Sequence, residues 1–168
     1  MTQLVPMSIK GLMLDPVSNS PIVVLKDEEE KFFLPIWVGI FEANAIALQL
    51  ENVATPRPMT HDLLKNAIAE LDASVTRVVI NDLRDSTFFA QIRVTIKRDG
   101  GDRMLELDAR PSDAIALALR TDAPIFVAQS VLEQAQTITP EPGDEQDEEK
   151  MKKWFENLGP DELGKYKM

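Results

Sequence analysis

A single histidine, His61, limits the acid–base chemistry that this 168-residue chain can support. Cleavage of a phosphodiester by a histidine pair needs one imidazole as the acid and another as the base, so that route is closed within one protomer. The absence of cysteine excludes zinc sites built from thiolates and a thiol nucleophile. What remains is a divalent ion, Mg²⁺ or Mn²⁺, that is held by carboxylates and activates a water molecule.

The carboxylates that could hold such an ion lie in two stretches of the chain. Glu42 stands alone on an otherwise apolar segment, and Asp108 and Asp113 flank an Arg-Pro dipeptide. These three residues are the candidate metal ligands, and Glu42, Asp113 and His61 are the candidate catalytic residues. The chain has no Asp-x-Asp pair, and Glu106-Leu107-Asp108 lacks the following lysine expected of a restriction-type metal site.

Three further residues could bind the phosphate of a substrate, namely Arg57, Arg110 and Ser112. Each of the two arginines precedes a proline. Either arginine could instead neutralise a carboxylate. Burial of Glu42 on an apolar helix would raise its pKa unless a cation pairs with it. We therefore expect Arg57 or Arg110 to be the partner of Glu42.

Each candidate also has a purely structural interpretation. Asp108 can pair with Arg93 across two strands, and Asp113 and Asp62 can each stabilise the N-terminal end of a helix. His61 can be an ordinary residue at a helix start. The sequence leaves both interpretations open.

These residues are distributed over alternating strands and helices. Apolar alternation and turn clusters predict strands at residues 4–14, 22–26, 31–38, 75–82, 88–97 and 125–128. Helices are predicted at 40–52, 61–72 and 111–121, with Thr60 as a cap and Pro111 at a first helical position, and Ser130 caps a brief fourth helix. The pattern predicts an α+β fold: a mostly antiparallel, strongly twisted mixed sheet with helices packed on it, plus a C-terminal amphipathic helix.

The central hairpin has a register that the alternation specifies. Gly100-Gly101 is a two-residue turn signal. Pairing outward from this turn puts Val94 opposite Leu107 and Arg93 opposite Asp108. Apolar residues then face apolar residues and a cation faces an anion, an arrangement that a slip of one residue would destroy.

Three segments make up the predicted domain organisation. Residues 1–137 form the α+β domain, residues 138–147 an acidic, proline-rich linker, and residues 148–168 a C-terminal helix and tail. Apolar residues recur in that helix at i, i+3, i+4 and i+7 from Met151 to Leu158. We expect this apolar face to dock onto the body of the protein or onto a neighbouring subunit.

Composition restricts the partners and the location of the protein. The net charge is −10 and no basic face is obvious, so binding to nucleic acid would need a local basic patch or bridging metal ions. No apolar run reaches the length of a membrane span, and the N-terminus lacks the pattern of a signal peptide. With the absence of cysteine, these features predict a cytoplasmic protein that does not enter a membrane.

Two separated stretches resemble the signature segments of a known family. The first is Leu34-Pro35-Ile36-Trp37-Val38-Gly39-Ile40-Phe41-Glu42-Ala43-Asn44-Ala45-Ile46-Ala47, which leads to Arg57-Pro58-Met59-Thr60-His61-Asp62-Leu63-Leu64. The second is Leu107-Asp108-Ala109-Arg110-Pro111-Ser112-Asp113-Ala114-Ile115-Ala116-Leu117-Ala118. Both resemble the bifunctional nuclease domain, a family named for cleavage of DNA and RNA. The resemblance spans about residues 5–135 and implies an α+β fold, nucleic acid as the partner and a homo-oligomer.

Two functions from different classes follow. One is a nuclease, acting on DNA and RNA phosphodiester bonds with a divalent metal ion. The other is a non-catalytic, oligomeric binding or regulatory module, which is favoured by the acidic composition and by the apolar residues on two faces of the helix at 40–52. The residue chemistry alone favours the second function, and the resemblance favours the nuclease.

Overall fold

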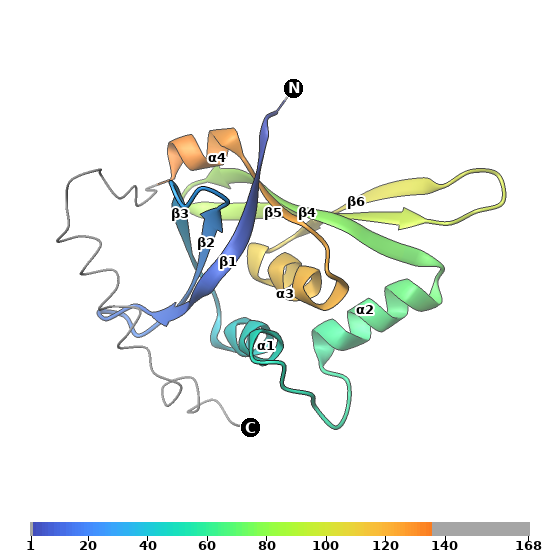
Figure 1. The fold of residues 1–168 in the computed structure, drawn as a ribbon, viewed down its shortest axis with the longest axis horizontal. Helices are drawn as coiled ribbons and strands as arrows, with labels where there is room; N and C mark the ends of the chain where they lie inside the picture. Colours follow the sequence, from blue (N-terminus) through green and yellow to red (C-terminus); the bar gives the residue numbers. More distant parts are fainter. Residues whose placement is uncertain (1, 136–168) are drawn as a thin grey trace.

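The computed structural model describes residues 2–135, which form one seven-stranded sheet and four helices (Figure 1). The strand order is β3-β2-β1-β7-β4-β5-β6. The strands are β1 (Leu4–Leu14), β2 (Pro21–Asp27), β3 (Phe33–Trp37), β4 (Ala73–Arg84), β5 (Thr87–Ile96), β6 (Arg103–Ala109) and β7 (Ile125–Ala128). The helices are α1 (Ile40–Leu50), α2 (Thr60–Glu70), α3 (Pro111–Thr121) and α4 (Gln129–Gln134).

The short strand β7 joins the two halves of the sheet. It lies antiparallel to the beginning of β1 and parallel to β4, whereas the other neighbouring strands are antiparallel. The N-terminal strands β1–β3 and the meander β4–β6 thereby share one sheet. This arrangement confirms the predicted mixed, mostly antiparallel α+β fold.

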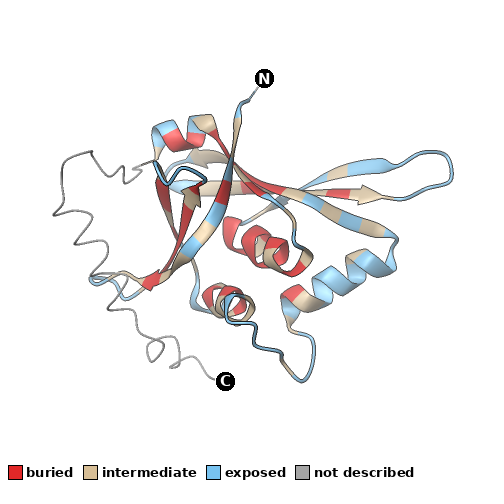
Figure 2. Cartoon of the chain, viewed as in Figure 1, coloured by how far each residue is buried: buried red, intermediate tan, exposed pale blue. Residues whose placement is uncertain are grey.

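Helix α3 is the central helix of the core. It contacts α1, α2, β4 and β5, and its residues Ala114 to Ala118 are almost completely buried (Figure 2). The side chains of Val78 and Ile80 on β4 belong to the same apolar cluster. By contrast, α1 buries Ala43, Ala45 and Ile46 but leaves Phe41 80% exposed at its N-terminal end. The doubly apolar helix of the sequence therefore has one buried and one exposed apolar face within the chain.

The β5–β6 register differs by two residues from the predicted one. Arg93 lies opposite Glu106, not Asp108, and Val94 lies opposite Leu105. The reason is the position of the turn, because the backbone N–H of Gly101 donates to the carbonyl of Arg98 and so centres the turn on Asp99-Gly100. A shift of two residues keeps every side chain on its predicted face, so the alternation could not distinguish the two registers.

The helix starts differ from the predicted caps. Met59 is the N-cap of α2, and Thr60 is the first helical residue. The Asp62 carboxylate accepts a hydrogen bond from the backbone N–H of Met59 at 2.9 Å, so a side chain inside the first turn performs the capping. Ala128, not Ser130, precedes α4. The linker at 138–147 and the helix predicted beyond it lie outside the described residues.

No helix within residues 2–135 is long and apolar enough to cross a membrane.

Candidate active site

Glu42 reaches the site from the first turn of α1. Its carboxylate folds back over Gly39, where a Cβ atom would collide with Glu42 Oε2. Only 16% of the Glu42 side chain is exposed. Glycine at position 39 therefore provides the space that the carboxylate occupies.

Arg110 connects Glu42 to Asp113. It is the N-cap residue of α3, directly after β6, and its Nη2 donates to Glu42 Oε1 at 2.7 Å. Its Nε donates to Asp113 Oδ2 at 2.8 Å. Of the two arginines expected to pair with Glu42, Arg110 is the one that does. The hydrogen bonds to Asp113 and Glu42 raise the pKa of Arg110, which keeps its charge, and 64% of its side chain remains exposed to solvent.

Asp113 in turn contacts the single histidine. His61 Nε2 lies 2.9 Å from Asp113 Oδ1, and the imidazole is buried at the beginning of α2. Burial by itself would raise the pKa of Asp113, but hydrogen bonds from Arg110 and His61 outweigh it and lower the pKa below its ordinary value. Because ionised Asp113 can only accept, a neutral His61 carries its proton on Nε2 and leaves the Nδ1 lone pair available.

Glu42, Arg110, Asp113 and His61 thus form one continuous chain of hydrogen bonds. Three helices contribute to it, since α1 carries the first residue, the start of α3 the next two, and α2 the last. A carboxylate-oriented imidazole is an arrangement suited to general-base catalysis, and an exposed guanidinium is suited to binding phosphate. The structure therefore brings together all three predicted catalytic residues.

An ion pair between Arg120 and Asp62 lies next to this chain of hydrogen bonds, on the same helices. Arg120 of α3 donates from Nε to Asp62 Oδ1 at 2.7 Å and from Nη2 to the carbonyl oxygen of Ala45 at 2.9 Å. Only 3% of the Arg120 side chain is exposed. Burial opposes ionisation of Asp62, but the hydrogen bonds from Met59 and Arg120 lower its pKa overall. The pair therefore connects all three helices behind the site.

Arg120 is the important residue that the sequence analysis did not identify. A signal for it exists, because Arg120 follows the apolar run from Ala114 to Leu119 and stands seven residues after Asp113. Two turns of a helix place residues i and i+7 on the same face. A lone cation on an apolar helix, aligned with a candidate site carboxylate, is a reason to expect an ionic partner on a neighbouring helix.

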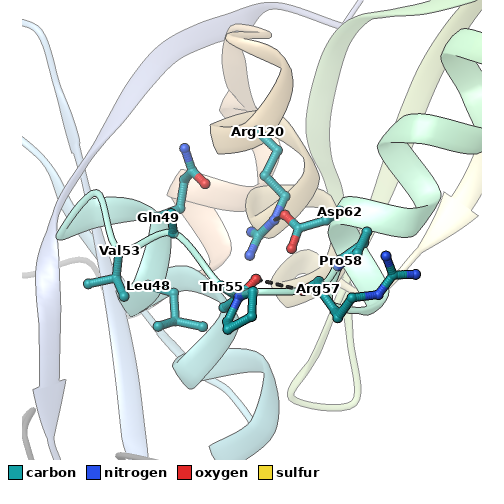
Figure 3. Close-up of a pocket in the computed structure, with 10 residues that line it drawn as sticks. Leu48, Gln49, Val53, Thr55, Arg57, Pro58, Asp62 and Arg120 are labelled. Carbon is teal, nitrogen blue, oxygen red and sulfur yellow. Dashed lines mark hydrogen bonds and ion pairs between the residues drawn. The ribbon is translucent and has the colours of Figure 1, made fainter.

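Arg57, the other arginine expected to pair with Glu42, lies beside the Arg120–Asp62 pair. A cavity of about 300 Å³ is bounded by α1, the segment 53–58, Asp62 and Arg120. Figure 3 shows Arg120 and Asp62 facing each other on one wall, with the extended segment that carries Arg57 along another. The Thr55 hydroxyl donates to the Arg57 carbonyl oxygen at 2.8 Å. Arg57 itself is exposed and remains a predicted phosphate ligand.

The other predicted residues are not gathered around Glu42. Asp108 is exposed on the edge strand β6, opposite Gln91, and Ser112 is buried in the first turn of α3. Within residues 2–135, no three acidic or histidine side chains are placed to hold a metal ion together. The carboxylates of Glu42 and Asp113 are both bonded to Arg110. A metal site built from Glu42, Asp108 and Asp113 thus stays a prediction.

Comparison with known proteins gives the family of this chain. The family model described as the bifunctional nuclease domain matches residues 23–140. An uncharacterized protein of Mycobacterium tuberculosis is 38% identical over 163 residues, which cover 92% of this chain and 95% of that protein. Bifunctional nuclease 2 of Oryza sativa subsp. japonica is 30% identical over 123 residues, covering 73% of this chain and 38% of its own length. Bifunctional nuclease 1 of Arabidopsis thaliana is 28% identical over 142 residues, covering 79% of this chain and 43% of its own length. The chain thus spans less than half of these plant proteins. It belongs to the bifunctional nuclease domain family.

Proposed function

We propose that this domain hydrolyses phosphodiester bonds in DNA and RNA, with His61, Asp113 and Arg110 as the reacting cluster. The observation that carries the proposal is the contact of 2.9 Å between His61 Nε2 and Asp113 Oδ1, with Arg110 bonded to the other oxygen of the same carboxylate. Membership of the family supports the choice of nucleic acid as the substrate. A cytoplasmic location is part of the same proposal.

Each residue of the cluster has a separate role in this proposal. Asp113 orients His61 and stabilises the imidazolium that forms when His61 Nδ1 takes a proton from the attacking water. As the new P–O bond forms, the P–O bond to the leaving oxygen breaks, and that oxygen takes a proton from the imidazolium or from solvent. Arg110, which is largely exposed, binds the phosphate and offsets the charge that develops on it. Glu42 holds the guanidinium of Arg110 from the other side and so fixes its direction. Ser112 and Arg57 remain proposed substrate ligands.

Among residues 2–135, no three carboxylates are placed to hold a divalent metal ion by themselves. Both oxygens of Asp113 and one oxygen of Glu42 accept hydrogen bonds from protein donors. Asp108 does not complete a set of three with them. Dependence on Mg²⁺ or Mn²⁺ therefore belongs to the proposal as a question for experiment, and the roles given above to the protein residues do not require it.

Cleavage of single-stranded DNA, duplex DNA and RNA by rigorously purified protein tests the proposal. Each substrate is incubated with Mg²⁺, with Mn²⁺ or with EDTA. The variants are Asp113→Asn, Glu42→Gln and His61→Gln, and the matched control is Asp99→Asn in the exposed β5–β6 turn. Loss of the base is expected to slow cleavage by about 10²- to 10⁴-fold, whereas the control keeps the rate of the wild type.

The same variants can also contradict the proposal. If folded Asp113→Asn and His61→Gln proteins cut as fast as the wild type, the cluster is not the catalytic site. EDTA distinguishes metal-dependent cleavage from cleavage by the protein residues alone, since abolished cleavage would establish the predicted metal dependence. Unchanged cleavage in EDTA would leave the protein residues as the whole catalytic apparatus.

A non-catalytic, oligomeric binding or regulatory module is the second candidate function. The observation that favours it is a group of exposed apolar side chains on and beside α2, with two more on opposite faces of the edge strand β6. Leu63 and Leu64 lie on α2 and Leu71 directly follows it, whereas Met104 and Leu107 lie on β6. Such surface commonly marks a protein interface, so we propose a homo-oligomer in either case. A monomer at micromolar concentration by light scattering would contradict the oligomer and remove the main support for this second function.

A further inference from the structure

A second polar cavity lies on the face of the sheet that does not contact α3. It has a volume of about 290 Å³, and Arg77, Asn81, Gln91 and Arg93 are among its lining residues. Arg77 and Val79 alternate along β4 with Val78 and Ile80, which belong to the core cluster that includes α3. Successive side chains of a strand point to opposite faces. The cavity is therefore separate from the Glu42–His61 site.

Two arginines face each other in this cavity. Arg77 on β4 lies directly opposite Arg93 on β5, and like charges in that position destabilise a sheet. Glu106 on β6 lies opposite Arg93 and forms an ion pair with it. Arg77 makes no ion pair within residues 2–135, and its nearest aromatic contact is the Phe126 ring, 6.0 Å from the guanidinium carbon. Arg77 thus has no ion-pair partner among the described residues, although Glu106 and Asp108 lie on the same face of β6.

Unsatisfied hydrogen-bonding atoms mark the same place. Within the described chain, the buried side-chain atoms without a hydrogen-bond partner are Arg77 Nε, a donor, and Asn81 Oδ1, an acceptor. Asn81 lies at a register shift, because Ile80 pairs with Ala90 and Asp82 pairs with Phe89. Such bulges redirect a side chain and often occur beside binding sites. Leaving either atom unpaired costs free energy that a bound partner would recover.

We infer that this cavity binds a small oxyanion that also carries an N–H or O–H donor. The anionic group pairs with the guanidinium of Arg77, which lines the cavity and faces Arg93. The donor satisfies Asn81 Oδ1. The volume accommodates a ligand up to about the size of a mononucleotide, at the lower end of the range for small-molecule sites. A phosphate ester and a hydroxycarboxylate share this chemistry.

Binding to the full-length protein tests this inference with three probes: inorganic phosphate, adenosine 5′-monophosphate and lactate. Each is titrated at constant ionic strength while the thermal midpoint and the heat of binding are measured. The variant Arg77→Met removes the charge and keeps most of the side-chain volume. The variant Asn81→Leu removes the acceptor. The control is Arg103→Met, which removes an exposed arginine from the same sheet.

We expect at least one probe to raise the midpoint of the wild type and of Arg103→Met. Arg77→Met should bind that probe about tenfold or more weakly, because a charged hydrogen bond is lost, and Asn81→Leu should bind it several-fold more weakly. Without any probe, Arg77→Met should unfold at a midpoint no lower than that of the wild type, since the repulsion of Arg93 is relieved. A preference among the three probes identifies the anionic group.

Two results would overturn the inference. The first is that no probe changes the midpoint of the wild type. The second is an equal change in the wild type and in Arg77→Met, because a general stabilising effect of the salt does not depend on Arg77.

Discussion

The Arg120–Asp62 pair offers the sharpest test of how the candidate site is held together. Arg120 is inaccessible to water over 97% of its side chain, since only 3% is exposed, and it contacts Asp62 on α2 and the Ala45 carbonyl on α1. Substitution by methionine keeps the apolar stem and removes all of these bonds. Asp62 then loses its partner while it remains on the helix that carries His61.

The expected loss of folding stability in Arg120→Met follows from the burial of the pair. Removing one member of a fully buried ion pair costs about 3–5 kcal/mol, because the other charge is left uncompensated. Asp62 retains 30% exposure of its side chain, so water can solvate its carboxylate after the change. We therefore place the cost of Arg120→Met near the lower end, at about 3 kcal/mol. That is a large share of the roughly 5–15 kcal/mol that stabilises an ordinary domain.

Urea unfolding of Arg120→Met, Asp62→Asn and the double variant measures this cost as a double-mutant cycle. We expect the sum of the two single losses of stability to exceed the loss in the double variant by at least about 1 kcal/mol, because the residues interact directly. The exposed pair Lys97–Asp102 supplies the control, and Lys97→Met should change the stability by less than about 1 kcal/mol.

Additive single effects would refute this reasoning, since Arg120 would then stabilise the protein through its apolar stem alone. A cost below about 1 kcal/mol for Arg120→Met would refute it as well, because the pair would then resemble an ordinary surface salt bridge.

Two further predictions concern the other residues of the site. Gly39→Ala should displace the Glu42 carboxylate from Arg110, because the new Cβ occupies the position of Glu42 Oε2; backbone strain is not expected at φ −68°. The rate of cleavage should fall while the urea midpoint changes little, and an unchanged rate in that variant would show that the Glu42–Arg110 bond is dispensable. The carboxyls of Asp62 and Asp113 have pKa values below their ordinary value of 3.8. Their contribution to stability is therefore complete well above the unfolded pKa of 3.8, begins to decrease near that pH, and is lost as the pH falls through the lowered pKa values. Urea unfolding between pH 2 and pH 6 should show this loss in the wild type and less of it in Asp113→Asn; a parallel pH dependence in both proteins would contradict the assignment.

Most of the fold could be predicted from local patterns. The helix at 111–121 and the short strand at 125–128 have the predicted bounds, and the alternation along β5 assigns its faces correctly. These features depend on the identities of residues two to four positions apart, which the sequence displays directly. The errors arose where a local signal had two solutions. Gly100-Gly101 and Asp99-Gly100 are both good turn dipeptides, and the two resulting registers give the same faces.

The residue types of the candidate site were also visible, but their partners were not. Arg57 and Arg110 have the same sequence context, an arginine before a proline. Only the position of Arg110 at the N-cap of α3, within 2.7 Å of Glu42, distinguishes them. The predicted register made Asp108 the partner of Arg93, but the position of the turn places Glu106 opposite Arg93.

The sequence by itself determined which chemistry is available: one imidazole, no thiol, and carboxylates beside arginines. It also determined the types of the secondary-structure elements, because propensity and alternation are properties of neighbouring residues. Only the tertiary structure decided that Glu42, Arg110, Asp113 and His61 form one chain of bonds and that Arg120 lies buried behind them. These contacts join residues up to 75 positions apart, from Ala45 to Arg120, and depend on how α1 and α2 pack on α3. Packing is a property of the whole core, so a local pattern cannot specify it.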